Sequence, residues 1–130
     1  MRLATLIIAA LLVPSASAQA QKWVEVGKTS SGNPVYVDPK TVKKADGIVN
    51  GTIRVRFLTP VKAGAKEFKS SRTLVMGNCA KKTVASKESI YFTDVAGTVV
   101  GQRTVNAKPG FGSPIKGTAS DVALTYLCSR

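Results

Sequence analysis

The sequence has no histidine, only two cysteines, one tryptophan and few acidic residues. Without histidine, the chain lacks the usual general base near neutral pH and the commonest nitrogen ligand of metal ions. Its seven acids are scattered along the sequence, so no carboxylate pair for acid–base catalysis is apparent. The two cysteines lack the C-x-x-C spacing of a redox motif. We therefore expect a protein without catalytic site, metal or cofactor.

Positive charge greatly exceeds negative charge, with 19 lysines and arginines against 7 aspartates and glutamates. Without Arg2, which lies in a candidate leader, 18 remain against 7, a net charge of +11. A field of this sign attracts polyanions such as lipopolysaccharide, nucleic acid, acidic glycans and acidic protein surfaces. The alternative interpretation is a basic protein without any such partner.

The first twenty residues have the three parts of a secretory signal peptide: Arg2, an apolar run, and small residues before Ala18 and Ala20. The apolar run is too short to span a bilayer. We expect residues 1–18 to be the signal peptide, with cleavage after Ala18 or alternatively after Ala20, and residues 19–130 to form one domain. No cysteine lies near the cleavage site, so we expect no lipoprotein anchor and a periplasmic or secreted protein.

Cys79 and Cys128 are expected to form a disulfide, because two cysteines in an exported chain usually pair in an oxidising compartment. A domain of this size buries only a modest core, so a covalent link is useful to it. Closing a loop of this length is worth about 4 kcal/mol in the chain-entropy description.

Alternating apolar and polar residues predict short strands separated by turns. Residues 22–27 and 34–38 should form an opening hairpin, followed by a helical turn with Asp38 as its cap and Pro39 at its first position. Later strands are expected at residues 72–79, 83–93 and 98–105. Because sequential strands tend to pair, a meander is the simplest topology.

The clearest strand is residues 48–58, where Ile53 and Val55 should face the core while Arg54 and Arg56 face solvent. Residues 59–70 contain proline, glycine and three lysines without a clear pattern, and we expect them to form a mobile basic loop.

Residues 106–117 have too much glycine and proline for a regular element, but helical spacing follows at once. Thr118 can cap this helix, with Asp121 three residues later as a short capping box, and Cys128 closes it. The sequence therefore predicts an α+β fold. Its single antiparallel sheet has about five to six strands in a meander, and a C-terminal α-helix packs on the sheet and is fastened to it by the disulfide.

The order of several short segments resembles the surface-adhesin protein E-like family of small exported bacterial proteins. The matching segments are Trp23-Val24-Glu25-Val26, Val35-Tyr36-Val37-Asp38-Pro39, Cys79 at a strand end, residues 91–100, and the spacing from Gly117-Thr118 to Cys128. The resemblance implies one antiparallel sheet, a C-terminal helix joined to it by a disulfide, and a possible homodimer.

Together these features predict an exported, non-enzymatic envelope or adhesin-like binding protein. We expect a basic surface to bind an anionic envelope component or a host-matrix protein, and the candidate residues are Arg54, Arg56, Lys62, Lys66, Lys81 and Lys82. The aromatic residues near Arg54 are better explained as core or sheet surface, so no specific nucleic acid is expected. The alternative is a small periplasmic enzyme, or an enzyme inhibitor that uses residues 106–117.

Overall fold

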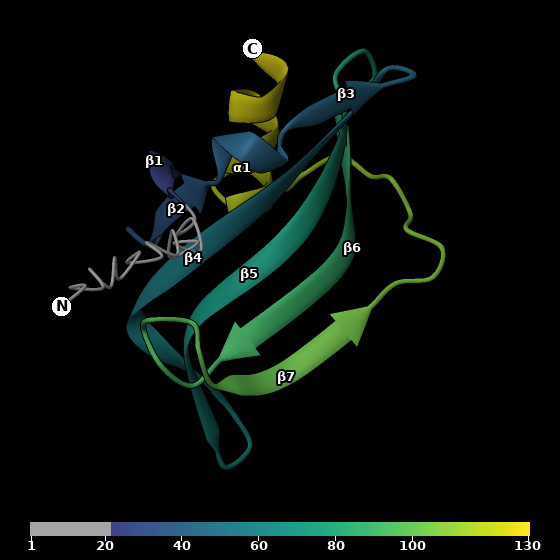
Figure 1. Ribbon diagram of the computed structural model, residues 1–130. Helices are drawn as coiled ribbons and strands as arrows, with labels where there is room; N and C mark the ends of the chain where they lie inside the picture. Colours follow the sequence, from purple (N-terminus) through teal and green to yellow (C-terminus); the bar gives the residue numbers. More distant parts are fainter. Residues whose placement is uncertain (1–21) are drawn as a thin grey trace, which may run out of the picture.

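The computed structural model describes residues 22–130, so the predicted signal peptide and its cleavage site at Ala18 lie outside the described residues. In this part of the chain, one antiparallel sheet is covered on one face by the helix α1 (Ala119–Cys128) (Figure 1). The strands are β1 (Val24–Lys28), β2 (Pro34–Val37), β3 (Lys43–Ala45), β4 (Ile48–Ala63), β5 (Lys66–Asn78), β6 (Thr83–Phe92) and β7 (Val100–Val105).

The strands follow the order β1-β2-β4-β5-β6-β7, and every pair is antiparallel. This confirms the predicted α+β meander. The strand β3, which pairs with the first residues of β4, was not predicted from the sequence. Asp46 and Gly47 connect β3 to β4 with φ of 53° and 76°, the backbone that an Asp-Gly hairpin turn requires.

The prediction of a mobile loop over residues 59–70 is wrong. These residues extend β4 and β5 into a long hairpin arm that projects beyond the rest of the sheet (Figure 1). Arg56 pairs with Ser70 and Val61 pairs with Phe68, so β4 advances five positions while β5 advances two. This irregularity interrupts the two-residue period, which is why the segment had no strand pattern.

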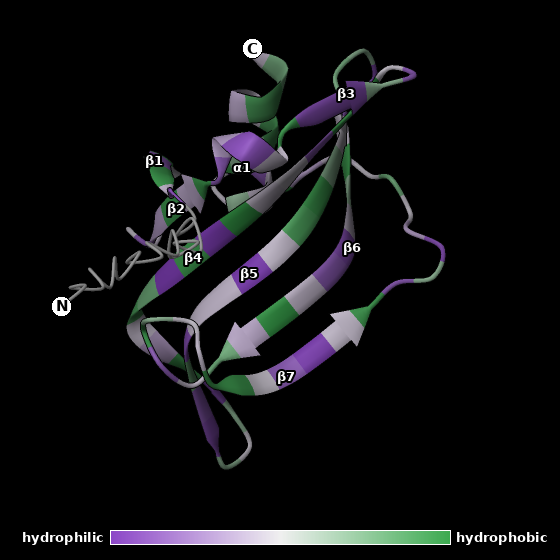
Figure 2. Ribbon diagram, viewed as in Figure 1, coloured by the Kyte–Doolittle hydropathy of each residue, from purple (hydrophilic) through white to green (hydrophobic). Residues whose placement is uncertain are grey.

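The main core lies between the sheet and α1. Its buried members come from β2, β4, β5 and α1, and they are Val35, Val37, Val49, Ile53, Val55, Val75, Ala123 and Leu127. Hydrophobic and hydrophilic residues alternate along β4, as expected for a sheet with one face against a core (Figure 2).

Glycines let α1 approach the sheet closely. A Cβ atom added to Gly51 would lie 2.8 Å from Leu127 Cδ2, and one added to Gly77 would lie 2.8 Å from Leu124 Cδ1. On β1, a Cβ atom on Gly27 would lie 2.8 Å from Val122 Cγ1. The helix therefore rests on backbone that carries no side chain.

The predicted caps at Thr118 and Asp38 are confirmed, but Asp121 departs from the predicted capping box because its carboxylate bonds to the residue before the cap and not to Thr118. Thr118 Oγ1 accepts a hydrogen bond from the Asp121 backbone N–H at 3.3 Å, and Asp121 Oδ2 accepts one from the Gly117 N–H at 3.0 Å. Asp38 caps the 3-10 turn Pro39–Thr41 through Oδ1, which accepts from the Lys40 N–H at 3.1 Å. Both caps satisfy backbone donors that the first helical turn leaves unpaired.

The predicted disulfide is also confirmed. Cys79 directly follows β5 and Cys128 is the last residue of α1, with their Cα atoms 5.4 Å apart. The bond therefore joins one end of the sheet to the C-terminal end of the helix, 49 residues later in the chain.

Candidate functional site

Three arginines lie in one row across the face of the sheet opposite α1. In this row Arg54 of β4 pairs with Arg72 of β5, Arg72 with Ile90 of β6, and Ile90 with Arg103 of β7. Directly paired residues in antiparallel strands point to the same face. The antiparallel register therefore concentrates positive charge along a line perpendicular to the strands.

Arg54 and Arg72 are both held against neighbouring groups. The Arg54 guanidinium donates a hydrogen bond from Nη2 to the Val95 carbonyl, and the Arg72 Cζ atom lies 5.7 Å from the centre of the Phe92 ring. The two arginines line a small hollow of about 60 Å³ together with Trp23 and Phe92. Cation–π contact and the carbonyl acceptor orient both groups but neutralise neither charge.

Within residues 22–130, neither Arg54 nor Arg72 forms an ion pair. Among these residues, Arg103 pairs with Glu88 at 3.1 Å and Lys62 with Glu67 at 3.9 Å. Among the described residues, the Arg54 and Arg72 guanidinium groups therefore have no carboxylate partner. Planar guanidinium groups bind carboxylate, sulfate and phosphate oxygens through directed, charge-assisted hydrogen bonds.

The loop between β6 and β7 borders this arginine pair and is fixed by its own hydrogen bonds. The Asp94 carboxylate accepts hydrogen bonds from the Thr98 hydroxyl and the backbone N–H groups of Thr98 and Val99, and these bonds lower the pKa of Asp94 to about 2. Ser70 Oγ also donates to the Asp94 carbonyl at 2.7 Å. The carbonyl that receives Arg54 therefore belongs to an ordered turn.

The structure divides the six predicted basic residues among three regions. Arg54, which is half-buried, and Arg56, which is exposed, share the face opposite α1. Lys62 and Lys66 lie on the hairpin arm, where Lys66 Nζ donates to the Gly101 carbonyl at 2.8 Å. The remaining two, Lys81 and Lys82, lie in the turn between β5 and β6. The six residues therefore do not form one patch.

The sequence analysis did not single out Arg72, although it predicted a strand beginning there. Its importance depends on the register that places it opposite Arg54, and no local pattern specifies that register. The odd spacing of three positions between Arg72 and the apolar Val75, which is a core residue, was the available signal that Arg72 faces away from the core.

Most of the acids have structural partners. Asp38, Asp94 and Asp121 accept backbone hydrogen bonds, while Glu67 and Glu88 form ion pairs. Among residues 22–130, no three histidine, cysteine, aspartate or glutamate side chains come together as a metal site would require. In the same part of the chain, no helix has the length and apolarity needed to cross a membrane.

The fold is similar to that of Haemophilus influenzae protein E. A crystal form of Haemophilus influenzae protein E matches with a TM-score of 0.57 and 16% identity, over 93% of this chain and 97% of that one. Protein E from non-typeable Haemophilus influenzae matches with a TM-score of 0.55 and 16% identity, over 91% of this chain and 82% of that one. No curated protein matches the sequence.

The sequence profile of the family described as surface-adhesin protein E matches residues 23–129, which include every strand and the helix α1. The order of segments that resembled this family therefore reflects membership, and the chain belongs to the surface-adhesin protein E family.

Proposed function

We propose that this protein is an exported, non-enzymatic binding protein that holds an anionic partner against the face of the sheet opposite α1. The observation that carries the proposal is the cross-strand pair of Arg54 and Arg72, two guanidinium groups without a carboxylate partner within residues 22–130. On the same face, Arg56 adds an exposed cation, whereas Arg103 is paired with Glu88.

The composition supports the same conclusion. The excess of lysine and arginine over acids creates a long-range field that attracts anions, and the arginine pair adds a local, directional contact. Membership of an adhesin family supports a partner at the bacterial envelope or in host matrix. The predicted signal peptide supports a location in the periplasm or outside the cell.

We extend the proposal to a homodimer. Within residues 22–130, the outer strands β1 and β7 each pair with one neighbouring strand, so each leaves a backbone edge that a second copy can extend. Light scattering of the mature protein at increasing concentration measures this directly.

The binding test compares two probes, lipopolysaccharide micelles for the envelope and heparin for sulfated matrix glycans, at low and physiological salt. We expect R54Q/R72Q to weaken binding to the preferred probe by at least about tenfold at low salt, equal to about 1.4 kcal/mol. The control K87Q/K108Q removes two charges from exposed lysines elsewhere on the chain and should weaken binding much less.

Equal losses in the two double variants would mean that only net charge matters, and the assignment to the arginine pair would then be wrong. Retention of neither probe at either salt would contradict anion binding itself. Circular dichroism of both variants checks that the fold is unchanged.

A further inference from the structure

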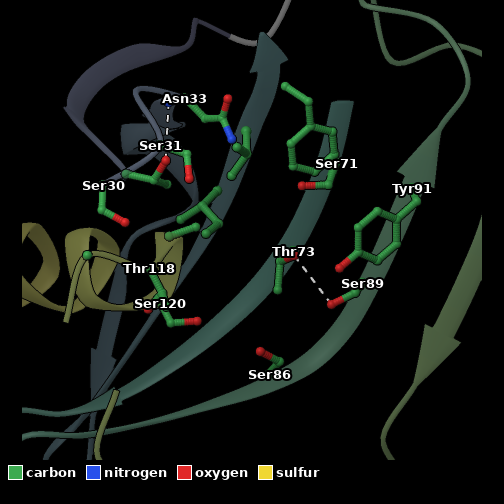
Figure 3. A pocket seen from close by; sticks show the side chains of 16 residues that line it. Ser30, Ser31, Asn33, Ser71, Thr73, Ser86, Ser89, Tyr91, Thr118 and Ser120 are labelled. Atoms are coloured by element: carbon green, nitrogen blue, oxygen red, sulfur yellow. Dashed lines mark hydrogen bonds between the residues drawn. The ribbon is translucent and has the colours of Figure 1, made fainter. Parts of the chain in front are cut away.

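A second hollow lies on the helix face of the sheet, beside the first turn of α1, where the helix leaves part of β5 and β6 uncovered. Its volume is about 370 Å³, within the range of small-molecule sites. The turn between β1 and β2 and the first turn of α1 form one side, and the middle of β4, β5 and β6 forms the floor (Figure 3). We call it the hydroxyl groove.

The lining of the hydroxyl groove has an unusual chemistry for this protein. Ten of its sixteen residues carry a hydroxyl group, and none carries a charge. The opposite face of β5 and β6 instead carries Arg72 and Glu88. If this face were only exposed to solvent, with no ligand, charged residues such as lysine or glutamate would be as suitable here as on the other face. The lining therefore combines many polar hydroxyl groups with the absence of charged side chains.

Ser71 is the most informative residue of the groove. Only 6% of the surface of Ser71 is exposed, and its hydroxyl points into the hollow (Figure 3). Within the described part of the chain, its Oγ atom has no hydrogen-bond partner. Because this hydroxyl opens into the hollow, it is available both to donate a hydrogen bond to a ligand there and to accept one.

The rim and floor of the groove are already fixed. The Ser30 backbone N–H donates to the Gly117 carbonyl at 2.8 Å and joins the β1–β2 turn to the start of α1. On the floor, Thr73 Oγ1 and Ser89 Oγ lie 3.3 Å apart and share a hydrogen bond. A ligand would therefore meet a site whose shape needs no rearrangement.

One side of the groove is apolar. Its apolar lining residues are Ile53, Val55, Phe57 and Tyr91, and the rings of Phe57 and Tyr91 have centroids 6.3 Å apart with an interplanar angle of 11°. A sugar ring has the same division, with C–H groups on its faces and hydroxyl groups around its edge. Hydroxyl side chains both donate and accept, so they complement the sugar hydroxyls in either direction.

We infer that the hydroxyl groove binds a short neutral saccharide, with Ser71 as a hydrogen-bond partner of one sugar hydroxyl. This site lies on the other face of the sheet from Arg54 and Arg72, and it differs from their proposed site in the charge of its ligand. Because the groove is uncharged, binding should not change between low and high salt.

The test titrates isotopically labelled mature protein with maltose, lactose and chitobiose, observed by amide NMR spectra. We expect at least one disaccharide to shift the amide signals of Ser71, Ser89 and Thr118 saturably, equally at both salt concentrations. S71A should weaken this binding by about tenfold or more without loss of stability, because the removed hydroxyl has no partner within residues 22–130. The matched control S113A removes an exposed hydroxyl outside the groove and should bind as the wild type does.

The inference is overturned if none of the three disaccharides shifts these signals, or if S71A binds as tightly as S113A. Shifts confined to the arginine face would equally place the saccharide elsewhere. A loss of heparin or lipopolysaccharide binding in R54Q/R72Q leaves this result unaffected, so the two proposals fail separately.

Discussion

Arg54 of β4 and Arg72 of β5 occupy directly opposite positions of the antiparallel ladder, with their side chains on the same face. Like charges in such a pair destabilise a sheet, by an amount comparable to the roughly 0.2–1 kcal/mol of favourable cross-strand pairs. The protein tolerates this repulsion on a face where neither arginine has a carboxylate partner among residues 22–130.

We predict that a double-mutant cycle with R54Q, R72Q and the double variant gives a repulsive coupling of roughly 0.2–1 kcal/mol at low salt. The cycle cancels the separate losses of the Val95 hydrogen bond and the Phe92 contact. Urea denaturation measures the free energy of unfolding of all four proteins. Salt at about 1 M should remove most of the coupling, and an attractive or salt-independent coupling would contradict this reading.

Asp94 should give the turn between β6 and β7 a specific dependence on pH. Its folded pKa of about 2 lies below the ordinary value of 3.8, mainly because the Thr98 hydroxyl donates to the carboxylate, with further bonds from the backbone. The carboxylate therefore contributes stability above about pH 3.8, and that contribution disappears as the pH falls through about 2.

We expect D94N to be less stable than the wild type near neutral pH and to approach it as the pH falls through this range. T98V should raise the pKa of Asp94 toward 3.8, as followed by the carboxyl carbon shift in an NMR titration. The control T104V alters an exposed threonine of β7 and should leave that titration unchanged. An Asp94 pKa unaffected by T98V would show that the hydroxyl is not the main cause.

The disulfide should contribute much of the stability of the domain. Because it closes a loop with a sequence separation of 49, C79S or C128S should lower the free energy of unfolding by about 4 kcal/mol in the chain-entropy description. Denaturant unfolding with and without reductant measures the loss. The double variant C79S/C128S should not respond to reductant, whereas the wild type should.

Thiol titration of the unfolded wild type gives an independent check, because it should find no free cysteine until reductant is added. Unfolding of C128S at the same denaturant concentration as the wild type would mean that packing alone holds α1 on the sheet.

The contact between α1 and the sheet should not tolerate a methyl group at Gly51 or Gly77. An added Cβ would lie 2.8 Å from a leucine methyl in either case, and both leucines are buried. We expect G51A and G77A each to cost about 1–3 kcal/mol of stability, as overpacked cores do. G110A is the matched control, since nothing lies within 4 Å of its added Cβ. Thermal unfolding compares the three, and equal melting temperatures would show that α1 can move aside.

The elements with strong local signals were predictable from the sequence. Thr118 and Asp121 marked the start of α1 because capping is a short-range interaction, and Ile53 with Arg54 marked the two faces of β4. The Asp46-Gly47 turn from β3 into β4 was also readable, but the three exposed residues of β3 gave no strand pattern of their own. The hairpin arm was missed because the irregular segment around Pro60 breaks the alternation.

The candidate sites were less predictable, because they depend on long-range pairing. Arg54 and Arg72 are far apart in sequence and meet only in the β4–β5 register. The hydroxyl groove gathers serines and threonines from a turn, two strands and a helix, including Ser30, Ser71 and Ser89. Each of these is an ordinary residue in its own segment.

The close contacts between α1 and the glycines of the sheet should affect how a ligand reaches the hydroxyl groove. Val122, Leu124 and Leu127 each fit over a glycine, so sliding the helix along the sheet would press these side chains against neighbouring backbone and Cβ atoms. The same helix supplies one wall of the hydroxyl groove through Thr118 and Ser120. We therefore expect this wall to stay in place, and a ligand to enter and leave at rates set by diffusion and by its own contacts.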